Sequence, residues 1–346
     1  MRATLEGYST HAIAAKIRSV HGNMLTQEDF REMVAKRSVA EVAEYLSRTP
    51  RYADRLRDVD PSSVHRGFLE QLVQAANIDI YGRLCRFPGM DKPFYKFMLR
   101  RYECAQMISL VNAVSCGLQT SFVQSLPAQL IEHSKIPFLE LAKCKDIDEL
   151  TAALKGTGYF KLFKSFARTE QGKVDFTDAE IKLRTDYCTR LIEDVKKSGF
   201  GSAGDELLRM IRTELDAINL INAYRLKAFF GYTPDEIRRT VLPFTHMGKT
   251  ALNRYFDCET PAQMTAMLMK SSVGRYMSPD DEDIEPPLRR RTLAMMEHTL
   301  ARTTSAPEAL YAFMYICMNE VSNTVRVIEG VRYDVDPAMI YKLLIF

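Results

Sequence analysis

Two short glycine motifs in the sequence have the residue types and spacing of phosphate chemistry. Gly199, Gly201 and Gly204 follow the order G-x-G-x-x-G, which lets a backbone approach a pyrophosphate at a helix N-terminus. The run Gly248-Lys249-Thr250 matches the end of a P-loop, whose backbone cradles nucleotide phosphates. If either motif were functional, the chain would be a P-loop or dinucleotide-dependent enzyme.

Neither motif stands in the sequence context that its chemistry requires. The residues before Gly199, "TRLIEDVKKS", are charged and predict a helix, whereas the dinucleotide fingerprint follows a strand. The first P-loop glycine is replaced by Pro243, which has no N–H and a fixed φ. We therefore interpret the glycine triplet as a turn between two helices.

The sequence contains no other motif for catalysis or cofactor binding. The six histidines show no H-E-x-x-H or paired spacing, and the seven cysteines are scattered singly without a C-x-x-C pair. An odd, dispersed set of cysteines is typical of reduced thiols in a cytosolic protein rather than of a disulfide framework or a zinc site. The sequence thus predicts no catalytic, cofactor-binding or metal-binding residue.

The most informative polar residues form a pattern that recurs three times. In each copy an acid is followed three residues later by a side-chain amide, within apolar residues spaced as on a partly buried helix. A buried carboxylate and amide are costly unless they are hydrogen-bonded. Two interpretations stay open: a structural network inside each copy, or groups presented to a partner. The pairs are Glu103 with Gln106, Asp216 with Asn219, and Glu320 with Asn323.

Two further segments recur with the same order along the chain. One is a short amphipathic segment that ends in a Thr or Ser turn, and the other is a longer charged amphipathic segment. The short segments are 38–52, 146–160 and 260–276, and the long ones are 62–87, 177–197 and 285–303.

These repeats predict an all-α protein. Convincing strand alternation is absent from the sequence, and the period is far longer than the 20–50 residues of stacked solenoid repeats. We expect three similar helical-bundle domains around a pseudo-threefold axis, with boundaries near residues 118 and 231. The domains would be 1–117, 118–230 and 231–346.

Charge and hydropathy limit the classes of partner. With 47 basic and 44 acidic side chains the formal net charge is +3, so no global field attracts nucleic acid or anionic lipid. No window approaches the roughly 20 apolar residues of a membrane-spanning helix. The sequence therefore predicts a protein without a transmembrane segment that recognises its partners locally.

Taken together, the repeats resemble a known family. Three all-α copies that each end in a D/E-x-x-N-type helix, the opening "MLTQEDFREMVAKRSVAEVAEYLSRTPRY" and the ending "EVSNTVRVIEGVRYDVDPAMIYKLL" are similar to the C subunit of V/A-type ATPases, the equivalent of the d subunit of the vacuolar proton pump. The likeness covers essentially the whole chain. Where that family carries N-I-R, this sequence has Asn323-Thr324-Val325-Arg326, which adds Arg326 to the candidate residues.

The resemblance implies a funnel of three domains on the cytoplasmic face of a membrane rotor ring. A central stalk would insert into the funnel, and the protein would transmit torque for ATP-coupled transport of H⁺ or Na⁺. It implies no catalytic residue, no cofactor, no nucleic acid and no small-molecule substrate. The alternatives are a helical adaptor unrelated to rotary ATPases and, less favoured, a P-loop or dinucleotide enzyme.

Overall fold

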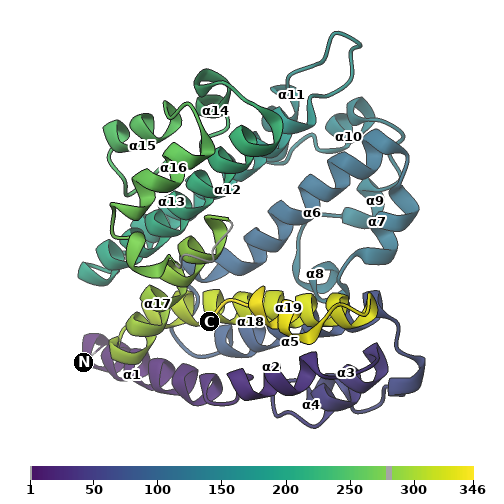
Figure 1. Ribbon diagram of the computed structural model, residues 1–346, viewed down its shortest axis with the longest axis vertical. Helices are drawn as coiled ribbons and strands as arrows, with labels where there is room; N and C mark the ends of the chain where they lie inside the picture. The colour runs from purple at the N-terminus through teal and green to yellow at the C-terminus, as the bar shows by residue number, and fades with distance from the viewer. Residues whose placement is uncertain (1, 278–282) are drawn as a thin grey trace. The chain divides into compact units, whose positions relative to one another are not determined.

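The computed structural model describes residues 2–277 and 283–346, and their regular structure is helical (Figure 1). Across these residues the β-structure consists of one isolated bridge, between Arg168 and Val174. The all-α prediction is confirmed. None of the helices in the described part of the chain combines the length and apolar character needed to cross a membrane.

The chain folds into two compact units. Unit 1 comprises Met1–Lys92, Gly201–Ala217 and Ala262–Phe346, and unit 2 comprises Pro93–Phe200 and Ile218–Pro261. The long helix α13 (Ser202–Phe230) supplies its first half to unit 1 and its second half to unit 2.

Unit 1 is built around helix α18, the third of the helices that carry an acid–amide pair. It packs against helices from both ends of the chain: α1, α2, α5 and α17. Val327 and Ile328 of α18 share a buried core with Phe30 and Leu69. Gly330 lets α19 approach closely, because a Cβ there would stand 2.6 Å from the side chain of Ile340. The helices are α1 (Arg2–His21), α2 (Gln27–Val34), α5 (Arg66–Cys85), α17 (Glu285–Arg302), α18 (Ala306–Arg332) and α19 (Pro337–Lys342).

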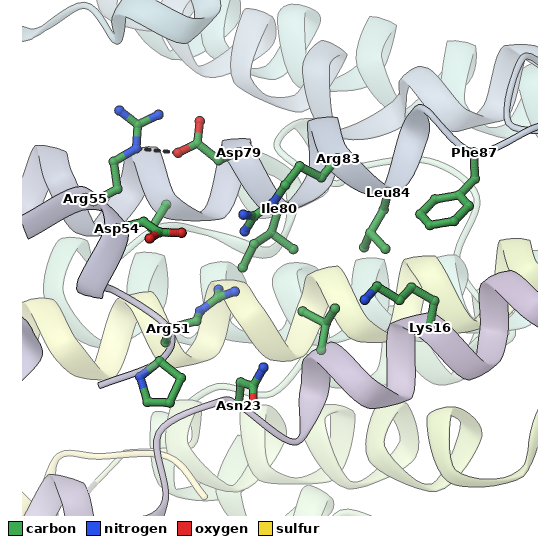
Figure 2. A pocket seen from close by; sticks show the side chains of 13 residues that line it. Lys16, Asn23, Arg51, Asp54, Arg55, Asp79, Ile80, Arg83, Leu84 and Phe87 are labelled. Atoms are coloured by element: carbon green, nitrogen blue, oxygen red, sulfur yellow. Dashed lines mark hydrogen bonds and ion pairs between the residues drawn. The ribbon is translucent and has the colours of Figure 1, made fainter. Parts of the chain in front are cut away.

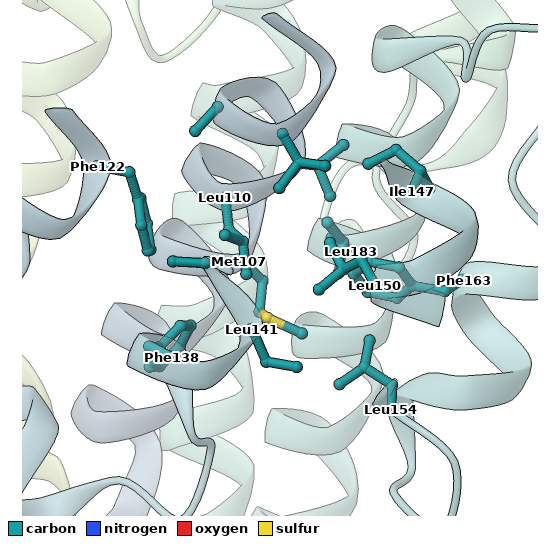
Figure 3. Packing of buried hydrophobic residues seen from close by; sticks show 14 of the residues in the cluster. Met107, Leu110, Phe122, Phe138, Leu141, Ile147, Leu150, Leu154, Phe163 and Leu183 are labelled. Atoms are coloured by element: carbon teal, nitrogen blue, oxygen red, sulfur yellow. The ribbon is translucent and has the colours of Figure 1, made fainter. Parts of the chain in front are cut away.

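Unit 2 is built around helix α6 (Phe97–Cys116), which packs along α12 (Phe176–Ser198). Figure 3 shows the apolar side chains that fill this core, with Met107 and Leu110 of α6 facing Leu141 and Leu150. The other helices of unit 2 are short: α7 (Gln119–Ser125), α8 (Ala128–His133), α9 (Phe138–Leu141), α10 (Ile147–Ala153), α11 (Tyr159–Lys164), α14 (Pro234–Arg239) and α15 (Lys249–Phe256).

Both cores combine residues that the expected domain boundaries assign to different domains. Leu110 and Phe122 lie on opposite sides of residue 118 and belong to one core. Val327 packs in the same core as Phe30, so the third patterned helix contributes to the core that the first residues of the chain form. The division into three domains stays a prediction. Helix α6 packs against short helices that follow it in the sequence, α7, α8 and α10. Helix α18 packs against α19, which follows it, and against α2 and α3 (Val39–Ser47) near the start of the chain.

The three short amphipathic segments fold alike. They form α3 (Val39–Ser47), α10 and α16 (Pro261–Met269), and a hydroxyl just beyond each helix donates to the carbonyl of a buried leucine. The donors are Thr49, Thr157 and Ser271, the acceptors are Leu46, Leu154 and Leu268, and each distance is 2.7 Å. Thr26 and Asp29 form a reciprocal capping box at the start of α2, as their spacing suggests.

The first two glycines of the triplet form a turn between helices, as predicted, and Gly204 lies in the first turn of α13. Helix α12 ends at Gly199, which adopts a left-handed φ of 64°, and Gly201 follows with a φ of 59°. Helix α13 then begins at Ser202. Glycine adopts this backbone conformation without the penalty that a side chain brings. At the second motif, Gly248 is the N-cap residue of α15.

The remaining elements are short. They are α4 (Ala53–Leu56) and the three 3-10 turns η1 (Pro61–Ser63), η2 (Pro93–Lys96) and η3 (Gly274–Tyr276).

Candidate interaction site

The carboxylate of Glu320 on α18 is the centre of a buried polar network in unit 1. Its Oε1 accepts from Arg51 Nε at 2.9 Å and from the hydroxyl of Tyr52 at 2.8 Å, and its Oε2 accepts from the backbone N–H of Leu25 at 2.7 Å. The side chains of Arg51 and Glu320 are only 1% and 3% exposed. A buried ion pair persists when further hydrogen bonds satisfy its remaining polar atoms, as they do at Glu320.

The amides of Asn323 and Asn219 each hold a backbone segment in the same way. Asn323 Nδ2 donates to the carbonyl of Ile345 at 2.8 Å, and its Oδ1 accepts from the N–H of Ile345 at 3.0 Å. Asn219 makes the same pair of bonds with Leu242, at 3.0 and 2.9 Å. Both asparagines are buried. Each one satisfies the N–H and the C=O of a residue outside the regular helices, and the carbonyl of Ile345 also accepts from Asn319 at 2.9 Å.

The first copy of the pair, Glu103 with Gln106 in unit 2, differs. Glu103 is half-buried and accepts from the hydroxyl of Ser134 at 2.6 Å. The side chain of Gln106 leaves its buried Oε1 without a hydrogen-bond partner among the described residues. The pattern that recurs in the sequence is therefore not satisfied identically in its three copies.

The other two candidates lie close to these pairs. Asp216 is buried on α13, in the part of that helix that belongs to unit 1, whereas Asn219 belongs to unit 2. Arg326 donates from Nη1 to Oδ1 of Asn323 at 3.3 Å. Its burial and the nearby Arg289 lower the pKa of the guanidinium. The structure thus brings Glu320, Asn323 and Arg326 onto one stretch of α18.

Glu103 and Arg51 also lie in different electrostatic environments. Burial raises the pKa of Glu103, although the Ser134 hydroxyl acts in the opposite direction. Burial opposes the charged form of Arg51, but neighbouring groups that include Glu320 hold its pKa above the ordinary value. Arg51 therefore stays charged inside unit 1.

Arg51 is the residue that sequence reasoning missed. It lies two residues after Thr49 in the turn that ends the first short segment, where the other copies carry Tyr159 and Val273 after Thr157 and Ser271. The sequence around Arg51 gave no signal for this role, because its partner Glu320 is 269 residues away.

The C-terminal ends of the three patterned helices, α6, α13 and α18, share a feature that the sequence patterns did not single out. Each helix is followed by a residue in the left-handed region: Gly117, Gly231 and Asp334. A large apolar side chain lies exposed beside each of these residues. These side chains, called the helix-end residues below, are Leu118 (51% exposed), Phe229 (72%), Phe230 (70%) and Tyr333 (68%).

In the described part of the chain, no group of three or more His, Cys, Asp or Glu side chains could hold a metal ion. The seven cysteines are free thiols, and Cys104, Cys188 and Cys317 are buried. The polar residues of α18 are therefore occupied with internal hydrogen bonds, while the helix-end residues are apolar and open to solvent.

Comparison with known proteins identifies the family of this chain. The model of the ATP synthase (C/AC39) subunit family matches residues 13–343. The chain belongs to this family, and the resemblance drawn from its repeats is confirmed.

Curated relatives agree with this assignment. A protein from Desulfurococcus sp. (strain SY), named as the C subunit of an A-type ATP synthase, is 22% identical over 293 residues, which cover 83% of this chain and 75% of the relative. The protein of the same name from Thermococcus kodakarensis is 21% identical over 292 residues, or 84% and 76% of the two chains. The one from Methanosphaera stadtmanae is 26% identical over 248 residues, or 70% and 60%. The chain is thus a subunit of a rotary ATPase or ATP synthase complex.

Proposed function

We propose that this chain is the non-catalytic coupling subunit of a V/A-type ATPase, which links the central stalk to the membrane rotor ring on the cytoplasmic face. In this role it transmits torque between ATP turnover and the transport of H⁺ or Na⁺. The family match over residues 13–343 supports membership of the complex. The three-domain funnel remains part of this proposal.

The observation that carries the contact with the ring is the repetition of the helix-end residues. Single exposed apolar side chains are ordinary on a protein surface. Here, however, they recur at the end of all three patterned helices, directly after the left-handed residue in the first copy and directly before it in the other two. A partner built from identical subunits offers the same surface to each copy, whereas a single stalk does not. We therefore assign the helix-end residues to the rotor ring.

The acid–amide pairs fit the structural interpretation better than the partner-binding one. Glu320, Asn323 and Asn219 direct their polar atoms to side chains or backbone within their own unit. Their role in coupling would be to keep α13 and α18 fixed to neighbouring segments, because a protein that transmits torque must resist deformation.

Co-purification tests this proposal. The tagged chain, expressed with its native membranes, is expected to recover both stalk and ring proteins. The double change Phe229→Ser and Phe230→Ser should reduce ring recovery and leave stalk recovery unchanged. Phe176→Ser, at a phenylalanine that is 37% exposed at the start of α12, serves as the matched control.

Two outcomes would contradict the account. Failure of the unaltered chain to recover either the stalk or the ring would remove the coupling function. Normal ring recovery by the double variant would leave the function standing but remove the helix-end residues as the ring contact.

A further inference from the structure

A pocket of about 320 Å³ opens in unit 1, and none of the helix-end residues lines it. It lies where the end of α1, the turn before α4 and the C-terminal half of α5 meet, and Figure 2 shows its lining side chains. Its volume is near the lower end of the range of small-molecule sites. Four cationic side chains line it, Lys16, Arg51, Arg55 and Arg83, together with two acids, Asp54 and Asp79.

Arg51 is the buried cation of this lining, and its guanidinium is incompletely hydrogen-bonded. Its Nε donates to Glu320, and its Nη2 donates to Oδ1 of Asn77 at 3.1 Å. Its Nη1 is buried and has no hydrogen-bond partner among the described residues. Unpaired buried donors are costly, and the cost is larger for a charged group. Arg51 is thus a buried, incompletely hydrogen-bonded cation beside the pocket, on a side chain that is only 1% exposed.

The pocket also has an excess of unpaired positive charge. Asp79, four residues before Arg83 on α5, forms its ion pair with Arg55. The other acid of the lining, Asp54, pairs with Arg57 at 2.7 Å. Within the described residues, Arg83 and Lys16 take part in no ion pair, and both are exposed. In Figure 2 the ends of Arg51 and Arg83 approach the middle of the pocket.

We propose that this pocket binds a phosphate group, which the exposed Arg83 and Lys16 hold at the mouth, next to the buried positive charge of Arg51. Arginine suits this task because its planar fork matches the oxygens of a phosphate in two directions at once. The site is independent of the ring contact and goes beyond the coupling function.

Two sources can supply the phosphate group. One is free inorganic phosphate, and the other is the phosphate of a nucleotide. Phe87 lines the same pocket and is 38% exposed, so its ring could support the base of a nucleotide but adds nothing for a free ion. Binding experiments with both probes separate the two sources.

Isothermal titration calorimetry of the purified full-length chain at low salt tests the site. Inorganic phosphate, and then ADP, are titrated into the unaltered chain and into Arg83→Ala and Lys16→Ala. We expect saturable phosphate binding with a Kd below about 1 mM. Each substitution should weaken it about tenfold, the value of one charge-assisted hydrogen bond.

The chain provides a matched control in unit 2. Arg190 on α12 follows Asp186 by the same four residues as Arg83 follows Asp79, but it pairs with that acid at 2.8 Å. Arg190→Ala should therefore leave phosphate binding unchanged. If ADP binds more tightly than phosphate and Phe87→Ala abolishes only that advantage, the source is a nucleotide. Equal affinities identify free phosphate as the source.

Two results would overturn the proposal. One is the absence of saturable binding of either probe to the unaltered chain. The other is binding that Arg83→Ala and Lys16→Ala leave unchanged, since the phosphate would then sit elsewhere. Both substitutions replace exposed side chains, so loss of binding can be separated from loss of fold by circular dichroism of the same samples.

Discussion

Helices α5 and α12 carry the same acid–arginine spacing, but their charges are paired differently. In unit 2, Arg190 pairs with Asp186 on its own helix and lies over the ring of Tyr159, 5.0 Å from the ring centre. Gly158 makes room for it, because a Cβ there would stand 3.1 Å from the guanidinium. The charges of this region are thus balanced within a few residues.

In unit 1 the corresponding groups are distributed over long distances in sequence. Asp79 pairs with Arg55, and Arg51 takes the place that Tyr159 has in unit 2 but turns to Glu320. Arg83 is left facing a pocket. The repeat therefore preserves helices and apolar positions, whereas the polar partners have diverged between the copies.

The acids of the two patterned helices differ in the same sense. Glu320 accepts three hydrogen bonds and has a buried cationic partner. Glu103 accepts one hydrogen bond from Ser134 and is half-buried. Substitutions should therefore have unequal effects at equivalent positions.

The largest effect is expected for Arg51→Ala. It leaves the Glu320 carboxylate buried without its cation, and breaking such a pair costs about 3–5 kcal/mol. Arg190→Ala removes a more exposed pair and should cost less than about 1 kcal/mol. The free energy of unfolding from urea denaturation measures both. Equal losses for the two variants would show that the buried pair is not special.

A smaller loss is expected when the asparagine contacts are removed. Asn323→Ala leaves the N–H of Ile345 without its partner, while the carbonyl keeps its bond from Asn319, and Asn219→Ala removes the partner of both the N–H and the C=O of Leu242. We expect a cost of about 1–3 kcal/mol for each. Hydrogen exchange should show faster exchange of the amide of Ile345 or Leu242, respectively. Unchanged protection of these amides would contradict the contacts described above.

The pKa of Glu103 predicts a dependence of stability on pH. Because burial raises this pKa in the folded state above the usual 4.5, its stabilising contribution is fully present below pH 4.5 and is lost as the pH rises through the folded-state value. Compared with Glu103→Gln, the unaltered chain should lose stability as the pH increases from 4.5. Urea denaturation of both proteins across this range is the measurement, and parallel curves would refute the prediction.

The smallest effect is expected at Gln106. Its Oε1 is buried without a partner among the described residues, so Gln106→Leu removes an unsatisfied acceptor. We expect the stability to change by less than about 0.5 kcal/mol or to increase. The same substitution at Asn323 should be clearly destabilising. A large loss at Gln106 in thermal unfolding would mean that this amide does hold a segment of the chain.

Features governed by nearby residues could be predicted from the sequence. The capping box of Thr26 and Asp29 and the turn at Gly199 each depend on neighbours a few residues away. The buried leucines of the short helices follow from apolar spacing, and Leu46, Leu154 and Leu268 are all buried. The family resemblance was also accessible, because the repeats extend over the whole chain.

Features that depend on distant partners could not be predicted. Arg51 and Glu320 are 269 residues apart in sequence, and nothing local to either one identifies the other. The partners of Asn323 and Asn219 are backbone groups, which every residue carries, so the side chains of Ile345 and Leu242 give no signal. The recurrence of the pattern showed that these residues matter without showing what they contact.

The coupling function itself is tested most directly by reconstitution. Vesicles that contain the complex assembled without this chain should hydrolyse ATP but build no ion gradient, and addition of the purified chain should restore the gradient. A gradient of equal size with and without the chain would contradict the proposal that it transmits torque from stalk to ring.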